Sequence, residues 1–139
     1  MEILAAIALV GNIIQFVDFS STLVSRMVQL YQSDKGALAE NIDVETATNH
    51  LVLLNNKLED SATATGDGPL QNLCRSCSAT AEELLATLDK LKVKGKQQTW
   101  ESIRKALRSM RSKEEINKLE RQLERFRQEL TLHIAADLR

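Results

Sequence analysis

The first thirty residues constrain the fold more than any other part of the chain, because they are apolar or small on nearly every side of a helix. The run begins MEILAAIALVGNIIQFVDF, and between Ile3 and Val17 only Asn12 and Gln15 are strongly polar. A single apolar stripe would be enough for a helix that lies on the surface of a globular domain. This helix therefore needs neighbours on several sides, or an apolar partner outside the domain.

Three interpretations of this helix follow. It is a buried helix of a helical bundle, a helix stored in the bundle and delivered to a membrane on activation, or a permanent membrane anchor. The third is disfavoured, because Asn12, Gln15 and Asp18 interrupt the roughly 20 apolar residues that a spanning helix needs. A secretory signal is not expected either, since position 2 is Glu and Asp18 stands in the cleavage region.

The composition and the positions of loop-forming residues predict an all-α fold. We expect a compact bundle of about five helices in one domain over residues 1–139. Proline occurs once, and Leu, Ala, Glu, Lys and Arg dominate. A polar loop is expected from Ser61 to Gly68, and Pro69 fits a first helical position. The last helix still looks helical at Arg139, so we expect an N-terminal fragment of a longer protein. The expected helices are Ile3–Tyr31, Asn41–Asp60, Pro69–Val93, a short helix over Trp100–Met110 and a last helix that follows Ser112.

Helical spacing also predicts which side chains form the core. In the first helix, which we expect to be central, Ile7, Val10, Ile14 and Val17 are predicted to be largely buried. Predicted caps are Gly95 at the end of the third helix, Thr99 at the start of the fourth, and a capping box of Ser112 and Glu115 before the fifth. The other predicted core residues are Ile42, Leu51, Leu54, Leu58, Leu70, Leu73, Cys77, Leu84, Leu88, Leu91, Trp100, Ile103, Leu107, Met110, Ile116, Leu119, Leu123, Phe126 and Leu130.

Charge is distributed unevenly along the chain. Residues 1–89 carry twelve acidic and four basic side chains, whereas residues 90–139 carry seven acidic and fourteen basic ones. This asymmetry indicates an interaction face or internal complementarity. The basic run of Lys90, Lys92, Lys94 and Lys96 is interpreted as a solvated helix end or, in second place, as a segment attracted to anionic lipid. Nucleic acid is not an expected partner, because no aromatic residue is interleaved with these lysines.

The sequence gives little support for catalysis, a metal or a cofactor. The two histidines, His50 and His133, have no Ser or Cys that the sequence places beside them, and no phosphate-binding glycine loop is present. Cys74 and Cys77 are spaced like a redox pair, but no strand precedes them and a second pair of zinc ligands is missing. We therefore expect no enzyme, no metal and no cofactor, and interpret the two thiols as buried and packed like small hydrophobic groups.

Several phrases of the sequence resemble one known family. They are ALVGNIIQFVDFSS near the N-terminus, LCRSC followed by AEELLATLDKLKVKGK in the middle, and WESIRKAL and LERQLERFRQEL towards the end. Over essentially the whole chain they look like the fungal HeLo-like N-terminal domain of STAND proteins, the fungal NOD-like receptors, which precedes a NACHT or NB-ARC module. The resemblance implies a helical bundle related to the HeLo domain of heterokaryon incompatibility proteins. This bundle is also similar to the executioner domain of necroptosis and to the coiled-coil domains of plant resistance receptors.

The function that this resemblance implies is programmed cell death in innate immunity. The domain would be cytoplasmic, would self-associate when the receptor oligomerises, and would be recruited to anionic membrane lipids by release of its first helix. The alternative is a helical adaptor or oligomerisation module that relays the signal through protein contacts without touching lipid. The downstream nucleotide-binding module of the same protein is an expected partner. The lipid-attracting residues would be Lys90, Lys92, Lys94 and Lys96, and the membrane-contacting ones would be Ile3, Leu4, Ile7, Val10, Ile13, Ile14, Phe16 and Val17.

Overall fold

The computed structural model describes residues 2–32, 43–64, 66, 68–94 and 100–137, and these residues contain five α-helices and no strand. The all-α fold and the number of helices are confirmed. In chain order the helices are α1 (Glu2–Gln32), α2 (Val44–Ala64), α3 (Gly68–Lys94), α4 (Trp100–Met110) and α5 (Lys113–Asp137).

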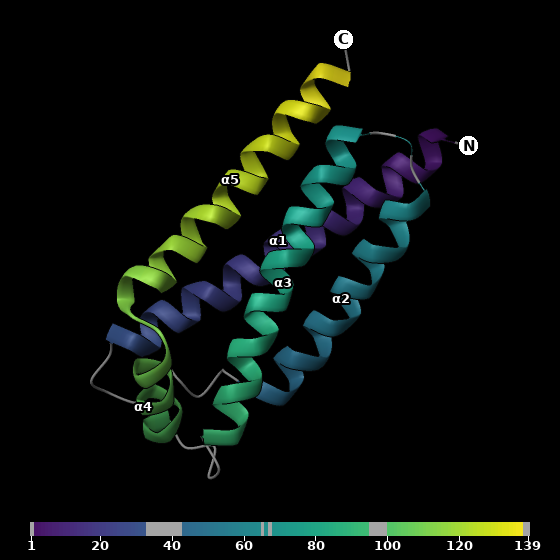
Figure 1. The fold of residues 1–139 in the computed structure, drawn as a ribbon. Helices are drawn as coiled ribbons and strands as arrows, with labels where there is room; N and C mark the ends of the chain where they lie inside the picture. The colour runs from purple at the N-terminus through teal and green to yellow at the C-terminus, as the bar shows by residue number, and fades with distance from the viewer. Residues whose placement is uncertain (1, 33–42, 65, 67, 95–99, 138–139) are drawn as a thin grey trace.

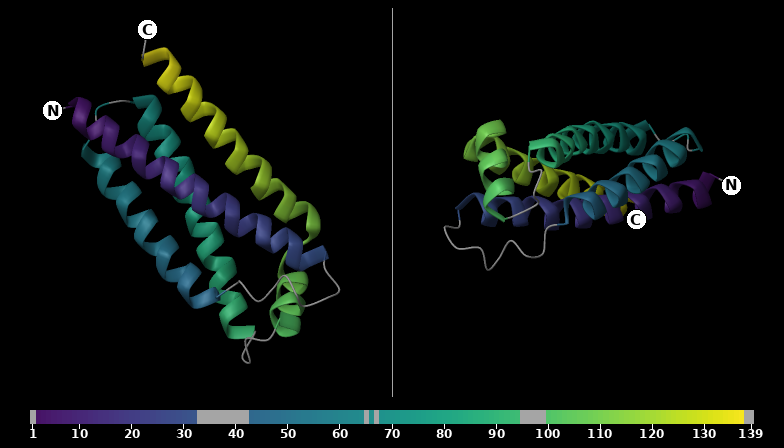
Figure 2. Two further views of the ribbon diagram at one scale, coloured as in Figure 1. Left: turned by 180° about the vertical axis from the view of Figure 1, so that it is seen from behind. Right: turned by 90° about the horizontal axis from the view of Figure 1, so that it is seen from below.

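Helix α1 is the central element of the bundle. It contacts the other four helices, and it crosses behind α3 in Figure 1, with α2 and α5 on either side. Seen from behind, α1 lies in front and runs diagonally over the bundle (Figure 2). Helices α2 and α3 pair as an antiparallel hairpin, and the short α4 packs against α3 and the C-terminal end of α1. One side of α1 is therefore covered by the bundle, and the other faces outward.

The core confirms most of the predicted inward positions. The predicted residues of α2, α3 and α5 that the structure describes are all buried, as are Ile103 and Leu107 of α4, while Met110 is partly buried. Ile42 lies outside the described residues, and nothing is described of the Trp100 side chain. Regular three- and four-residue spacing of Leu, Ile and Phe identifies these faces because most large apolar residues of each helix lie on one stripe, with Val52, Leu53 and Leu132 as exposed exceptions.

The predicted buried face of α1 is partly wrong. Val17 is 2% exposed as predicted, and Val10 is partly buried, but Ile7 is 61% and Ile14 42% exposed. Phe16, which follows Ile7 by nine residues or about two and a half turns, points the opposite way and is fully buried. The covered stripe of this helix consists of Leu9, Ile13, Phe16, Val17, Ser20, Leu23, Val24, Met27 and Leu30.

Helix α2 also differs from its predicted bounds, since its last turn, Ser61 to Ala64, was predicted to be a loop. Contacts with neighbouring helices explain this difference. The side-chain amide of Asn12 donates a hydrogen bond to the Ser61 hydroxyl, and the Gln71 side chain donates one to the Ala62 carbonyl at 2.8 Å. These partners satisfy polar groups at a helix end that a polar sequence alone would leave to water.

Caps define the starts of two helices. The Asp43 carboxylate accepts a hydrogen bond from the Thr46 backbone N–H at 3.1 Å, and this bond holds the pKa of Asp43 below its usual value. Before α5, the Glu115 N–H donates to the Ser112 hydroxyl at 3.1 Å and the Ser112 N–H donates to the Glu115 carboxylate at 3.2 Å. The predicted capping box is thus confirmed, whereas the predicted caps Gly95 and Thr99 lie outside the described residues.

Candidate functional site

The outward side of α1 carries large apolar side chains that the bundle leaves uncovered. Leu4 is 70%, Ile7 61% and Ile14 42% exposed, and we call these three residues the α1 apolar face. Within the described residues, α1 is also the one helix long and apolar enough to cross a membrane, and only 28% of its most apolar window is buried. An apolar cluster on the surface of a domain marks a contact site more often than scattered single residues do.

The eight predicted membrane-contacting residues divide into two groups. Leu4, Ile7 and Ile14 form the α1 apolar face, whereas the other described members belong wholly or partly to the core. Nothing is described of the Ile3 side chain. The structure therefore brings only three of the predicted residues to the surface, and the core members would reach a lipid only if α1 left the bundle. The core members are Val10, Ile13, Phe16 and Val17.

A shallow groove runs along one edge of the α1 apolar face, between α1 and α5. Its volume is about 140 Å³, and Ile14 and Val17 line it from one side while Leu130 and Ile134 line it from the other. An ion pair between α1 and α5, with the Arg127 guanidinium 3.2 Å from the carboxylate of Asp18, also lines the groove. Both partners are largely exposed, so solvent screens this pair and its contribution to stability is small.

Polar contacts attach α1 to its neighbours at several points along its length, and sequence reasoning missed them. Near the N-terminal end, the Asn12 amide donates to Ser61 and to the Lys57 carbonyl of α2. At the C-terminal end, the Arg108 guanidinium of α4 donates to the Tyr31 carbonyl and lies 5.3 Å from the centre of the Tyr31 ring. Asn12, one of two strongly polar residues between Ile3 and Val17, was the available signal, because an amide that is partly buried requires partners.

The predicted basic segment lies far from the most exposed part of the α1 apolar face. Lys90 and Lys92 are exposed near the C-terminal end of α3, nothing is described of the Lys94 side chain, and Lys96 lies outside the described residues. In Figure 1 this end of α3 lies at the bottom of the bundle, whereas the N-terminus of α1 lies at the top. The 31 residues of α1 extend over about 46 Å. The structure therefore does not combine the two predicted lipid-contacting groups into one site.

Comparison with known families identifies the domain. A family model, SesA, described as an N-terminal domain on NACHT NTPase and P-loop NTPases, matches residues 10–130. The chain belongs to the SesA family. The expected N-terminal domain of a NOD-like receptor is confirmed at this level, and a downstream nucleotide-binding module is supported as its partner in the same protein. No curated protein and no solved structure matches the chain.

The matched range has a consequence for the α1 apolar face of this SesA domain. The match begins at Val10, so Leu4 and Ile7 precede it and Ile14 falls within it. Family membership therefore says nothing about the two most exposed apolar residues of α1. A role for them depends on their exposure in the structure.

The two cysteines of the SesA domain are structural. Cys77 is fully buried, and the Cys74 thiol is 3.2 Å from the Leu58 carbonyl of α2, to which it donates. Burial raises the pKa of Cys74 to about 11, with a further increase from Glu59, and burial also raises the pKa of Cys77. Both thiols are free and remain protonated near neutral pH, which makes them poor nucleophiles. The interpretation as thiols packed like small hydrophobic groups is confirmed.

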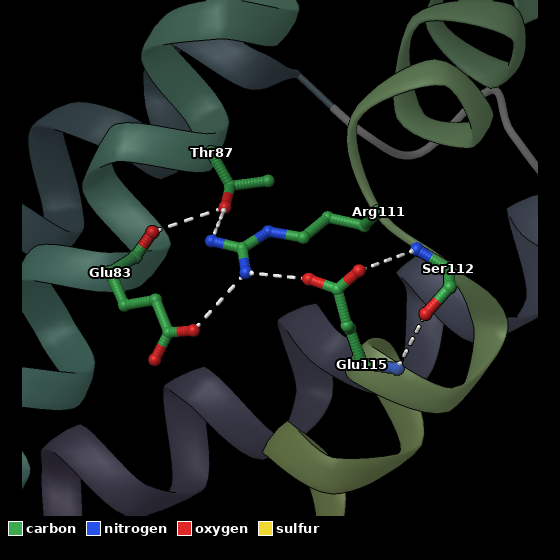
Figure 3. Close-up of polar contacts among 5 residues, drawn as sticks. All are labelled: Glu83, Thr87, Arg111, Ser112 and Glu115. Atoms are coloured by element: carbon green, nitrogen blue, oxygen red, sulfur yellow. Dashed lines mark hydrogen bonds and ion pairs between the residues drawn. The ribbon is translucent and has the colours of Figure 1, made fainter.

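One arginine joins the start of α5 to α3. Arg111 contacts the carboxylates of Glu83 and Glu115 at 3.2 Å each and donates to the Thr87 hydroxyl at 3.1 Å, as Figure 3 shows. Glu115 is also the partner of Ser112 in the capping box, and the bonds from Ser112, with Arg111 in addition, lower the pKa of Glu115. A helix cap and a contact between helices therefore share one carboxylate.

Proposed function

We propose that this SesA domain is a non-enzymatic effector of a NOD-like receptor in programmed cell death. In this proposal it self-associates when the receptor oligomerises, moves from the cytoplasm to a membrane and permeabilises it through α1. The observation that carries the proposal is the α1 apolar face, Leu4, Ile7 and Ile14, on the helix whose other side forms the core. A fungal origin and a role in heterokaryon incompatibility follow only from the resemblance of the sequence to HeLo-like domains.

The energetics favour contact with lipid or with another helix. Burying a large aliphatic side chain contributes roughly 1.5–3 kcal/mol, so the three side chains of the α1 apolar face would contribute several kcal/mol on transfer to an acyl interface. Gly11 lies between Ile7 and Ile14 on α1, and an added Cβ there would meet no atom within 4 Å. The surface near Gly11 therefore has room for the close approach of a second helix, as small residues allow in membranes.

Liposome leakage by the isolated domain tests the membrane proposal. Deletion of residues 1–20 would be ambiguous, because it removes Leu9, Ile13 and Phe16 from the core. Ile7→Glu with Ile14→Glu is sharper, since the two side chains are 61% and 42% exposed and neither belongs to the core. We expect this double variant to keep its helical circular dichroism and to lose at least tenfold in leakage of anionic vesicles.

A matched control uses a second pair of exposed apolar side chains on another helix. Val52 is 39% and Leu53 60% exposed on α2, so Val52→Glu with Leu53→Glu removes similar apolar surface and adds the same charge. We expect this variant to leak vesicles within a factor of two of the parent. Equal loss in both double variants would contradict a specific role for α1. Absence of vesicle binding by the folded parent, even when it is artificially clustered, would favour the adaptor.

The adaptor remains the second candidate function because apolar residues are exposed on helices other than α1 as well. Val52 and Leu53 on α2 and Leu132, 69% exposed on α5, are available for protein contacts away from the α1 apolar face. In this reading the receptor's signal passes through contacts between helices of neighbouring domains, and no lipid is bound. Loss of self-association in the Val52→Glu, Leu53→Glu variant, measured by light scattering, with vesicle leakage absent in the parent, would support it.

A further inference from the structure

A second surface of the domain has the chemistry of a binding site, and it is separate from the α1 apolar face. A cleft of about 600 Å³ lies between α3 and the first half of α5. This volume is within the range of clefts that bind small molecules, roughly 300–1,000 Å³. Its ionisable lining consists of the cations Arg111, Lys118, Arg121 and Arg125 and the carboxylates Glu83 and Glu115.

The charges of the cleft are not balanced. The carboxylates of Glu83 and Glu115 both form ion pairs with Arg111. The negative charge of the cleft is therefore gathered around Arg111. Within the described part of the chain, Arg121 pairs only with an exposed carboxylate, that of Glu114, at 3.2 Å. Among the residues that the structure describes, neither Lys118 nor Arg125 forms an ion pair. The cleft therefore presents an excess of positive charge, four cations against two carboxylates.

The donor groups fit phosphate oxygens. A guanidinium offers a planar pair of N–H donors that binds phosphate in a bidentate manner, and a lysine ammonium adds a compact charge. Lys118, Arg121 and Arg125 follow one another at intervals of three and four residues on α5, which places them on one side of that helix, and the amide of Gln122 lies among them. We propose that this cleft binds a small soluble anion with two or more phosphate groups.

The position of the cleft separates this proposal from membrane binding by α1. In Figure 1 α3 lies in front of α1, and in Figure 3 the contacts of Arg111 lie between α3 and α5 with α1 behind them. The α1 apolar face is on the outward side of α1, which Figure 2 shows from behind. A flat membrane on the α1 apolar face would not reach the cleft. A soluble phosphate compound therefore fits the cleft better than a lipid headgroup, and the cleft proposal holds whether or not α1 binds lipid.

Titration with sodium tripolyphosphate in a calorimeter tests the cleft. We expect the parent domain to bind one tripolyphosphate, and Lys118→Gln with Arg125→Gln to weaken binding at least tenfold. The matched control is Lys57→Gln with Arg75→Gln, which removes two exposed cations from α2 and α3 outside the cleft lining and should change the affinity by less than twofold. If both variants lost the same affinity for tripolyphosphate, the proposal would be overturned. Tripolyphosphate would then be attracted by the net charge of the domain and not by the cleft. Absence of binding to the parent at millimolar tripolyphosphate would overturn it as well.

A second measurement distinguishes the two sources of phosphate. Sedimentation with vesicles rich in anionic phospholipid should be the same for the parent and the Lys118→Gln, Arg125→Gln variant if the ligand is soluble. Loss of vesicle binding in that variant alone would overturn the soluble ligand and assign the cleft to a lipid headgroup. The four side chains that are changed in the two variants are exposed, so both should keep the parent's circular dichroism spectrum. Where a double variant fails that check, the single change Lys118→Gln or Lys57→Gln replaces it, with a correspondingly smaller expected effect.

Discussion

At the scale of single residues, burial separates side chains of the same type that lie close together in the sequence. Leu123 and Leu132 are both on α5, but Leu123 is fully buried in the core and Leu132 is 69% exposed. Replacing Leu123 by Ala should lower the free energy of unfolding by about 2–5 kcal/mol, because it removes apolar contacts and leaves a cavity. The same replacement at Leu132 should change it by less than about 0.5 kcal/mol. Urea denaturation of the two variants measures the difference, and similar losses at the two positions would contradict the assigned core.

Two buried hydroxyl groups of the core lack a hydrogen-bond partner among the described residues. They belong to Ser20 of α1 and Thr80 of α3, which are almost completely buried. An unpaired buried polar group costs free energy relative to a paired one. Both hydroxyls are therefore less favourable for folding than paired hydroxyls would be at the same positions.

At the scale of elements, the number of apolar faces on a helix decides whether its core positions can be predicted from the sequence. Leu119, Leu123 and Phe126 on α5 could be assigned to the core from spacing, since the positions between them are polar. The predicted burial of Ile7 and Ile14 is wrong because α1 is apolar on nearly all sides, so its own sequence does not determine which side the neighbours cover. That choice depends on packing between helices.

The two candidate functional surfaces also differ in how far the sequence predicts them. The α1 apolar face could be predicted as a candidate region, but not which residues of α1 are exposed. The cleft between α3 and α5 could not be predicted, because its residues come from two segments whose register is fixed only by tertiary contacts such as Arg111 with Glu83. Charge runs in the sequence drew attention to Lys90–Lys96 instead.

The start of α5 provides a prediction at the element scale. Ser112→Ala removes the hydroxyl that accepts from the Glu115 N–H and should lower the free energy of unfolding by about 0.5–2 kcal/mol. Ser76→Ala is the matched control, since Ser76 is exposed within α3 and its hydroxyl donates to the Asn72 carbonyl of the same helix. We expect the control to be neutral or slightly stabilising, because alanine favours a helix interior. Thermal and urea unfolding measure both variants, and equal destabilisation would rule out a particular contribution from the cap.

At the scale of the whole molecule, part of the charge asymmetry between the two halves of the chain is used internally. Asp18 and Glu83 from the acidic first part pair with Arg127 and Arg111 from the basic second part. These pairs join α5 to α1, and join Arg111, two residues before α5, to α3. Of the other cations of α5, Lys118, Arg121 and Arg125 line the cleft and Lys113 does not. The asymmetry therefore provides internal complementarity, and in the cleft proposal it also provides an interaction face.

Whether α1 must leave the bundle is the main mechanical question at this scale, and a cross-link across the Asp18–Arg127 contact answers it. Asp18→Cys with Arg127→Cys places two exposed thiols on α1 and α5, and a bismaleimide with an internal disulfide can connect them. Cys74 and Cys77 should not react in the folded domain, because both are buried and the pKa of each thiol is raised. If permeabilisation requires release of α1, the cross-linked domain should lose at least tenfold in vesicle leakage, and reduction of the linker should restore it.

The control for this experiment places the same linker where α1 stays free. Glu101→Cys with Lys105→Cys uses two exposed positions one turn apart on α4, and its cross-linking should leave leakage within a factor of two. Full leakage by the domain cross-linked between α1 and α5 would mean that the α1 apolar face acts in place, through Leu4, Ile7 and Ile14, without release. The covered residues of α1, Leu9 and Phe16 among them, would then serve only the core, and α1 would hold the bundle together while its outer side contacts lipid.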